Sequence, residues 1–301
     1  MKIIITGGSG LIGRALTASL AQAGHEVIVL SRKPEAVKNL PAGARAEKWD
    51  GQSAQGWSQW IDSNTAIVNL AGATISERWT DTHKQAIRES RLNAGRAIVA
   101  AVKAAAEKPS VVVQSSAVGY YGPRGSEEIG EDASAGSDFL ASVATDWEGS
   151  TAELEQLGVR RVIVRTGVVL DKRGGALPLM ALPVKLFVGG PLGGGQQYLP
   201  WIHLDDEVAA IRFLIENSTT KGVYNLSAPQ PVTNAEFVKV LGKVLGRPTF
   251  MPTPGFALKL VLGEMSTLVL DGQRQMPKRL LAAGFKFQYG DAASALRAIY
   301  K

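Results

Sequence analysis

Cysteine is absent from this sequence of 301 residues, and histidine occurs only three times, at positions 25, 83 and 203. Without cysteine the chain has no disulfides, no cysteine nucleophile and no thiolate metal site. Three scattered histidines do not make a histidine-rich metal motif. We therefore expect no metal centre.

Long hydrophobic runs are also absent. No apolar stretch approaches the roughly 18 to 20 residues that a helix needs to cross a bilayer, although 45% of the residues are hydrophobic. A strand pattern begins at residue 2 and leaves no room for a signal peptide. We expect a globular cytoplasmic protein without a membrane partner, built on one large core or on a large domain with a smaller appendage.

The chain has no block of like charge. Its 33 Lys and Arg against 27 Asp and Glu give a net charge of +6, but the two signs mostly alternate along the sequence. This pattern indicates a mixed, solvated surface with a local basic pocket for an anionic cofactor. It does not favour nucleic acid as a partner.

What is present is a strand, a glycine-rich turn and a helix at the start of the chain. Residues 2–6 are apolar and rich in Ile, Gly7, Gly10 and Gly13 follow, and a helical pattern runs from residue 11 to about residue 23. Glycines let the backbone approach a pyrophosphate, and the helix N-terminus favours its negative charge. The alternative is an ordinary strand-to-helix turn. The predicted cofactor contacts in this stretch are Gly7, Ser9, Gly10, Leu11, Ile12 and Gly13.

The end of the second strand indicates which dinucleotide binds. The strand is predicted over residues 25–30 and is followed by Ser31, Arg32 and Lys33. An acidic residue at this point binds the ribose 2′-hydroxyl, whereas arginine accommodates a 2′-phosphate. Ser31 and Arg32 therefore favour NADP over NAD, and the alternative is a solvated Arg-Lys pair that begins a loop.

Strand and helix patterns alternate through the rest of the first half and predict an α/β fold, a doubly wound parallel sheet of the Rossmann type with a smaller C-terminal α/β substrate lobe. We assign residues 1–170 to the cofactor domain and residues 171–301 mainly to the lobe, with 201–228 returning to the sheet.

Residues 174–200 are rich in Gly and Pro and are predicted to form a loop. Asp205 or Asp206 is expected to cap the helix that follows. Further strands are predicted over 46–49, 66–70, 111–114, 161–165 and 223–227, and helices over 81–106 and 139–157.

The turn resembles that of the extended short-chain dehydrogenase/reductase superfamily, because its glycines are spaced Gly-x-x-Gly-x-x-Gly. Nearly the whole chain resembles one atypical branch, an NADP-binding "epimerase family" of uncertain substrate. The resemblance implies that Leu70, Ala71, Gly72, Arg91 and Ser115 lie beside the cofactor; Arg91 could instead pair on the surface with Glu89. The motifs that carry the resemblance are Ser31-Arg32, Asn69-Leu70-Ala71-Gly72, Arg78-Trp79, Ser90-Arg91, Gly119-Tyr120-Tyr121, Asp146-Trp147-Glu148, Arg165-Thr166-Gly167, Gly189-Gly190-Pro191-Leu192-Gly193 and Trp201-Ile202-His203.

The catalytic groups of the superfamily are missing. Its members use a Ser, and a Tyr and a Lys four residues apart on a helix, to move a proton at the substrate oxygen. Matching the motifs places Ala117, Leu140 and Ala144 at these three positions. The replacement candidates for the proton donor are Tyr120, Tyr121 and Ser116, with Ser115 and His203 as lesser ones. The two tyrosines could instead only wall the pocket.

The resemblance leaves two functions open. The first is an NADP-dependent oxidoreductase or epimerase that acts on an unidentified small molecule through a non-standard active site. The second is a non-catalytic NADP-binding sensor or regulatory protein. Related folds pair through the helices predicted at about 82–106 and 139–157, so the resemblance also implies a possible homodimer.

Overall fold

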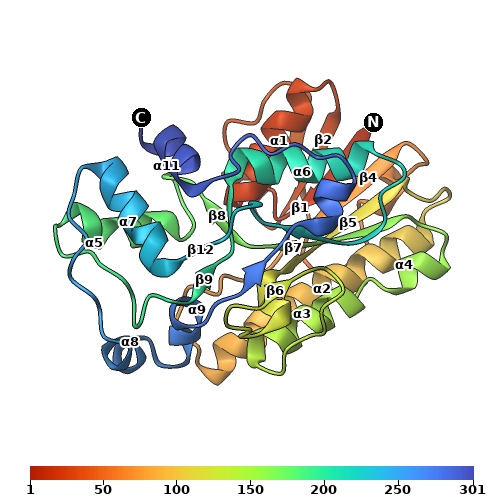
Figure 1. Cartoon of the computed structure of the whole chain (residues 1–301). Helices are drawn as coiled ribbons and strands as arrows, with labels where there is room; N and C mark the ends of the chain where they lie inside the picture. Colours follow the sequence, from red (N-terminus) through yellow and green to blue (C-terminus); the bar gives the residue numbers. More distant parts are fainter.

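A computed structural model describes all residues, 1–301, and confirms the doubly wound fold (Figure 1). Seven strands form one sheet in the order β11-β7-β5-β4-β1-β2-β3, and every neighbouring pair is parallel. Because the order reverses between β1 and β4, a crevice opens there at the carboxyl ends of the strands. The strands are β1 (Lys2–Thr6), β2 (Glu26–Ser31), β3 (Ala44–Lys48), β4 (Thr65–Asn69), β5 (Val111–Ala117), β7 (Arg161–Thr166) and β11 (Gly222–Leu226).

Helices cover both faces of the sheet (Figure 1). On one face lie α1 (Leu11–Gln22) and α6 (Leu204–Glu216), and on the other lie α2 (Asp81–Ala104), α3 (Phe139–Gly149) and α4 (Glu153–Gln156). The side chains of Ile3 and Ile5 join the core on the α1 side, whereas Ile4 joins the core on the α2 side. This alternation explains why the strands read as continuous apolar runs: both of their faces are buried.

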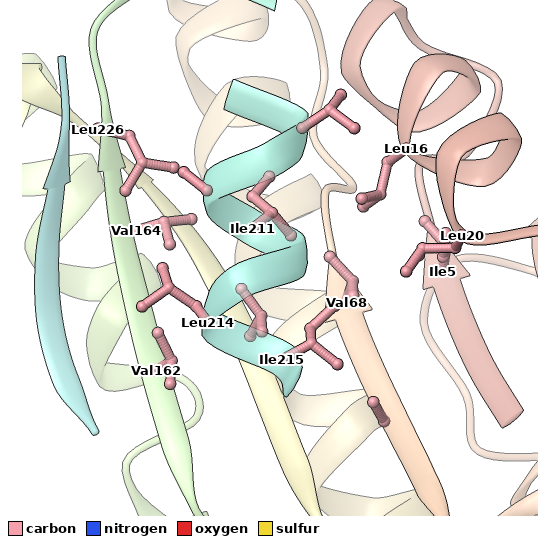
Figure 2. Packing of buried hydrophobic residues seen from close by; sticks show 14 of the residues in the cluster. Ile5, Leu16, Leu20, Val68, Val162, Val164, Ile211, Leu214, Ile215 and Leu226 are labelled. Carbon is pink, nitrogen blue, oxygen red and sulfur yellow. The ribbon is translucent and has the colours of Figure 1, made fainter. Parts of the chain in front are cut away.

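Helix α6 is the centre of the first core. Ile211, Leu214 and Ile215 recur at helical spacing and point down onto the sheet, between the side chains of β7 and those of β4 (Figure 2). Leu16 and Leu20 of α1 pack beside them. Because α6 comes from residues beyond 200, the late part of the chain is needed to complete the face of the cofactor sheet.

The C-terminal lobe has its own core. Helices α5 (Leu177–Lys185), α7 (Asn234–Leu245) and α11 (Ala292–Tyr300) bury a shared set of side chains that includes Phe237, Leu241 and Leu296. The remaining elements are β6 (Glu128–Ile129), β8 (Val168–Leu170), β9 (Tyr198–Leu199), β10 (Trp201–His203), β12 (Val232–Thr233), α8 (Gly255–Leu262), η4 (Gly263–Ser266), α9 (Thr267–Leu270), β13 (Arg274–Gln275), α10 (Lys278–Ala282) and the short turns η1 (Pro34–Ala36), η2 (Ser58–Trp60) and η3 (Val118–Tyr121).

Several local predictions are corrected by the structure. Helix α5 occupies part of residues 174–200, which we expected to be a loop, because Leu177, Ala181 and Val184 find a buried apolar surface. The cap of α6 is the His203 side chain, which accepts from the Asp205 backbone N–H, and not Asp205 or Asp206. The helix expected over 139–157 is divided into α3 and α4.

The segment 201–228 returns to the sheet only in part. Strand β11 joins the seven-stranded sheet, and α6 packs on its face, but β10 pairs with β8 in a separate two-stranded ribbon. The division of the chain at residue 170 remains a prediction.

The first turn of α6 buries a carboxyl group that lacks a full set of partners. Glu207 is wholly buried, one of its oxygens accepts from the Thr166 hydroxyl (2.9 Å), and the other has no partner. Burial raises the pKa of Glu207 from 4.5 to about 8, so the folded protein holds this proton at neutral pH.

This buried acid predicts a pH-dependent stability. A raised folded-state pKa means that stability is full below pH 4.5 and is lost as the pH rises toward about 8, by up to about 1.4 kcal/mol per pH unit. In Glu207→Gln this contribution to the slope should disappear, because the amide cannot ionise. Urea unfolding of both proteins at pH 5, 6, 7 and 8 measures the difference, and a difference that does not change with pH would contradict the assignment.

Candidate cofactor and substrate site

The glycine turn leaves space for a ligand at its three glycines. Gly7 and Gly13 have no room for a side chain, and Gly10 lies beside open space. A Cβ on Gly13 would lie 2.5 Å from the Gly7 carbonyl oxygen, and a Cβ on Gly7, whose φ is +68°, would lie 2.5 Å from the Leu70 carbonyl oxygen. Because glycine has no Cβ at these two positions, the backbones of α1, β1 and the end of β4 can approach one another closely. Gly10 is the N-cap of α1 and provides no side-chain cap, so the first N–H groups of this helix are available to an anion.

A cavity of about 480 Å³ extends from this turn into the C-terminal lobe. Its walls come from the turn, the ends of β4, β5 and β7, helices α2 and α3, and residues of β9 and α9 in the lobe. The predicted cofactor residues that line it are Gly7, Gly10, Leu11, Ile12, Gly13, Leu70 and Arg91. Those that do not are Ser9, Ser31, Arg32, Ala71, Gly72 and Ser115.

Ser31 and Arg32 lie outside the cavity, at the carboxyl end of β2. Arg32 is exposed, and its carbonyl oxygen accepts from Lys48 Nζ (2.6 Å), whereas its guanidinium makes no ion pair within the protein. The Ser31 hydroxyl accepts from the Lys33 backbone N–H (3.2 Å). An unpaired guanidinium beside a serine hydroxyl fits a phosphate.

Arg91 brings an unneutralised positive charge to the cavity wall. Its Nη1 donates to the carbonyl oxygens of Ala73 (3.1 Å) and Ile87 (2.9 Å), and its guanidinium lies 4.9 Å from the centre of the Trp147 ring. No carboxylate pairs with it; Glu89 instead accepts from Gln85. Burial lowers the pKa of Arg91 to about 10, so it stays charged at neutral pH. A buried cation with unused N–H donors fits an anionic or hydroxyl-bearing ligand.

The candidate proton donors after β5 are held in a buried network instead. Tyr121 is fully buried, donates to Asn225 Oδ1 (2.6 Å) and accepts from Arg165 Nη1 (3.0 Å). Burial raises the pKa of Tyr121, which makes it a weaker acid. Ser116 donates to Glu148 Oε1 (2.6 Å).

Tyr120 belongs to the same network, because the Arg165 guanidinium lies 3.4 Å from its ring centre. Ser115 is buried, and His203 caps α6. None of these candidates lines the cavity. The geometry therefore does not favour Tyr120, Tyr121 or Ser116 as the proton donor, and it supports the alternative that they shape the structure around the pocket.

The three positions that the resemblance matches to the superfamily's catalytic groups line the cavity. Ala117, Leu140 and Ala144 form part of its wall, so no hydroxyl, phenol or ammonium projects from these positions. The ionisable side chains that line the cavity are those of Arg91, Tyr198 and Asp271.

Sequence reasoning missed Tyr198 and Asp271. Tyr198 lies on β9, and the Arg274 guanidinium is 5.3 Å from its ring centre. Burial, together with the negative charge of Asp138, raises the pKa of Asp271. The Gln273 amide donates to the Gly122 carbonyl oxygen (3.0 Å), which holds this segment over the end of β5. No local pattern marks these residues, because the lobe brings them in from distant parts of the chain.

Comparison with known proteins agrees with this architecture. The sequence pattern of the NAD dependent epimerase/dehydratase family matches residues 3–227. The chain belongs to this family. A second pattern, a domain of unknown function (DUF1731), matches residues 253–299. The family membership confirms the predicted resemblance to the extended short-chain superfamily.

Relatives from other organisms match along nearly the whole chain. The epimerase family protein YfhF of Bacillus subtilis is 39% identical, and the match covers 98% of this chain and 97% of YfhF. The chloroplastic SDR39U1 homolog of Arabidopsis thaliana is 41% identical over 99% of this chain and 86% of its own length. Human SDR39U1, crystallised with NADPH, has a TM-score of 0.89 at 36% identity, covering 100% of this chain and 99% of the human one. UDP-glucose 4-epimerase of Thermus thermophilus shares the fold at 17% identity (TM-score 0.77).

No helix in this family member is both long enough and apolar enough to cross a bilayer. The cytoplasmic location and the homodimer remain predictions.

The network around Tyr121 predicts that this residue is structural. Tyr121→Phe removes two buried hydrogen bonds, those to Asn225 and from Arg165, and should lower the free energy of unfolding by about 1–3 kcal/mol, while the affinity for NADPH stays unchanged. Urea unfolding and a fluorescence titration with NADPH check the two parts. A variant that unfolds like the wild type but loses a catalytic turnover would return Tyr121 to the list of proton donors.

Proposed function

We propose that the protein binds NADP(H) and uses it as an oxidoreductase on a small molecule. Two features together carry this proposal. The guanidinium groups of Arg32 and Arg91 have no carboxylate partner, and the glycine turn leaves space at the N-terminus of α1. The cradle fits a dinucleotide, since a Cβ at Gly7 or Gly13 would meet the backbone. The NADPH bound to the human relative supports the same cofactor here.

Each predicted residue then has a part in holding the cofactor. The turn, with Gly7, Ser9, Gly10, Leu11, Ile12 and Gly13, receives the pyrophosphate. Ser31 and Arg32 bind the 2′-phosphate, while Leu70, Ala71 and Gly72 flank the cofactor along the end of β4. Arg91 donates to its oxygens from α2, and Ser115 supports the wall from β5.

The choice between NADPH and NADH should depend on Arg32. Arg32→Ala should weaken NADPH binding by about 1.5–3 kcal/mol and leave NADH nearly unchanged, because only NADPH carries the 2′-phosphate. Gly10→Val is the matched control: its Cβ meets only the Gly7 carbonyl oxygen, at 3.3 Å, so the fold should survive while both cofactors are blocked. Fluorescence titrations with both cofactors decide; equal weakening by Arg32→Ala would contradict the assignment.

Tyr198 is the side chain best placed to move a proton at the substrate. Tyr198 lines the cavity. The segment that carries it is tied to the end of the sheet, because the Pro200 carbonyl oxygen accepts from the Val168 backbone N–H (2.6 Å) just beyond β7. Bound NADPH supplies a hydride for a carbonyl carbon. Tyr198 Oη gives its proton to the carbonyl oxygen, and the Arg274 guanidinium, which also pairs with Glu128 (3.1 Å), lies 5.3 Å from the centre of the ring that becomes negative. Leu140 and Ala144 line the same cavity and add apolar surface to its wall.

Tyr198→Phe should lower kcat for carbonyl reduction by about 100-fold or more with NADPH affinity unchanged. The measurement is NADPH oxidation with a panel of aldehydes, ketones and quinones, together with calorimetric binding of the best compound to the complex with NADP⁺. Tyr120→Phe is the matched control and should keep the wild-type rate. Full activity of Tyr198→Phe beside an inactive Asp271→Asn would transfer the proton-donor role to Asp271.

A second candidate function is a non-catalytic NADP(H) sensor. It is favoured by the apolar residues at all three customary catalytic positions, Ala117, Leu140 and Ala144. The same panel separates the two functions. If NADPH binds tightly but no compound is reduced, the oxidoreductase proposal fails and the sensor becomes the better account.

A further inference from the structure

The exposed apolar side chains of this protein are concentrated in two segments. Of the large hydrophobic residues that are exposed, five fall within residues 179–188 and five within 250–261, and only Leu281 lies elsewhere. On α8, Phe256 is 76% exposed and Leu260 is 85% exposed. Scattered apolar residues are normal on a protein surface, but a contiguous group indicates a binding surface.

The two segments meet between residues 187–189 and 247–251, and we call the exposed residues of 179–188 and 247–261 the α5–α8 surface. The backbone N–H of Met251 donates to the Gly189 carbonyl oxygen (3.2 Å), and the Arg247 guanidinium lies 4.6 Å from the Phe187 ring centre. Both helices lie on the side of the molecule away from the seven-stranded sheet (Figure 1).

Helix α5 is apolar on two faces. Leu177, Ala181 and Val184 are buried in the core of the lobe, while Leu179 and Leu182 are exposed on the opposite face. A helix that packs against one core needs apolar side chains on one face only. The exposed apolar side chains on the other face of α5 therefore contribute nothing to the core of the lobe.

The same surface is bordered by positive charge. Residues 179–188 and 247–261 contain three Lys or Arg and no Asp or Glu. Lys185 ends α5, Arg247 stacks on Phe187, and Lys259 lies on α8 between Phe256 and Leu260. The local excess of positive charge is hidden in the sequence because acidic residues elsewhere offset it.

We propose that the α5–α8 surface docks the protein on an anionic lipid bilayer. Exposed Phe, Leu and Val side chains flanked by Lys and Arg match the interfacial zone of such a membrane, where apolar groups enter the acyl boundary and cations meet the headgroups. A second copy of this chain is a poorer partner, because the same cations would face each other. Nucleic acid would accept the charges but not the apolar side chains.

This mode of binding is compatible with the absence of a spanning helix. The expectation of no membrane partner rested on the length of apolar runs, whereas docking depends on a surface assembled from two distant segments. The surface also lies near the cavity: α8 is followed directly by η4 and α9, and Thr267 and Leu268 line the cavity wall.

The test is flotation of the full-length protein with vesicles of phosphatidylcholine alone and of phosphatidylcholine mixed with phosphatidylglycerol. We expect binding to the mixed vesicles at low salt, little binding to the neutral ones, and release as salt is added. Absence of binding to the anionic vesicles at low salt would overturn the proposal.

Two pairs of variants separate the apolar and the charged contributions. Phe256→Ser with Leu260→Ser, and Arg247→Glu with Lys259→Glu, should each lower the bound fraction by about tenfold. Their matched controls are Leu281→Ser, and Lys221→Glu with Lys286→Glu, which change exposed residues outside the surface and should bind like the wild type.

NADPH titration verifies that each variant is folded, and no substrate is needed. If the controls lost binding equally, the attraction would be general electrostatics and the α5–α8 surface would not be the docking site. If the apolar variant left vesicle binding intact but converted a dimer to a monomer in sedimentation, the surface would be a protein interface and the proposal would fail.

Discussion

The buried ion pair between Arg165 and Glu148 is the interaction on which the region around the cavity depends. Arg165 at the end of β7 donates to both Glu148 oxygens on α3 (2.8 and 2.9 Å), while Ser116 of β5 and Tyr121 of η3 hydrogen-bond to the same pair. Removing one partner of such a pair leaves a buried charge and costs about 3–5 kcal/mol. The pair thereby fixes α3, whose residues Leu140, Val143 and Ala144 supply apolar wall to the cavity.

Cofactor recognition was the part of the site that the sequence could predict, because it depends on local patterns. A strand, three glycines and a helix specify the turn within a dozen residues, and Arg32 follows a strand that a continuous apolar run reveals. Tyr198 and Asp271 were missed because their position comes from tertiary packing of the lobe. The same reason explains α5: it carries Pro178 in its first turn and Pro183 in its interior, and the burial of Leu177, Ala181 and Val184 in the core of the lobe stabilises the helix.

The two halves of the cavity therefore differ in how they are built. The half at the glycine turn includes the glycine backbone and the guanidinium of Arg91, which has no carboxylate partner, and this suits a ligand with negative charge. The half in the lobe mixes apolar residues with a few polar side chains, those of Tyr198, Thr267, Asp271 and Gln273. Such a lining selects by shape and by a few hydrogen bonds, and it provides little for a second diphosphate.

Because α11 is synthesised after all seven strands of the sheet, the core of the lobe is completed later than the sheet. The α11 residues Ala295, Leu296 and Ile299 are buried against the lobe, although they lie within the last seven positions of the chain. All seven strands of the sheet precede residue 227. The sheet can therefore emerge from the ribosome and fold while the lobe still lacks part of its core. For that interval the nascent protein exposes the apolar face of α7 that α11 will cover.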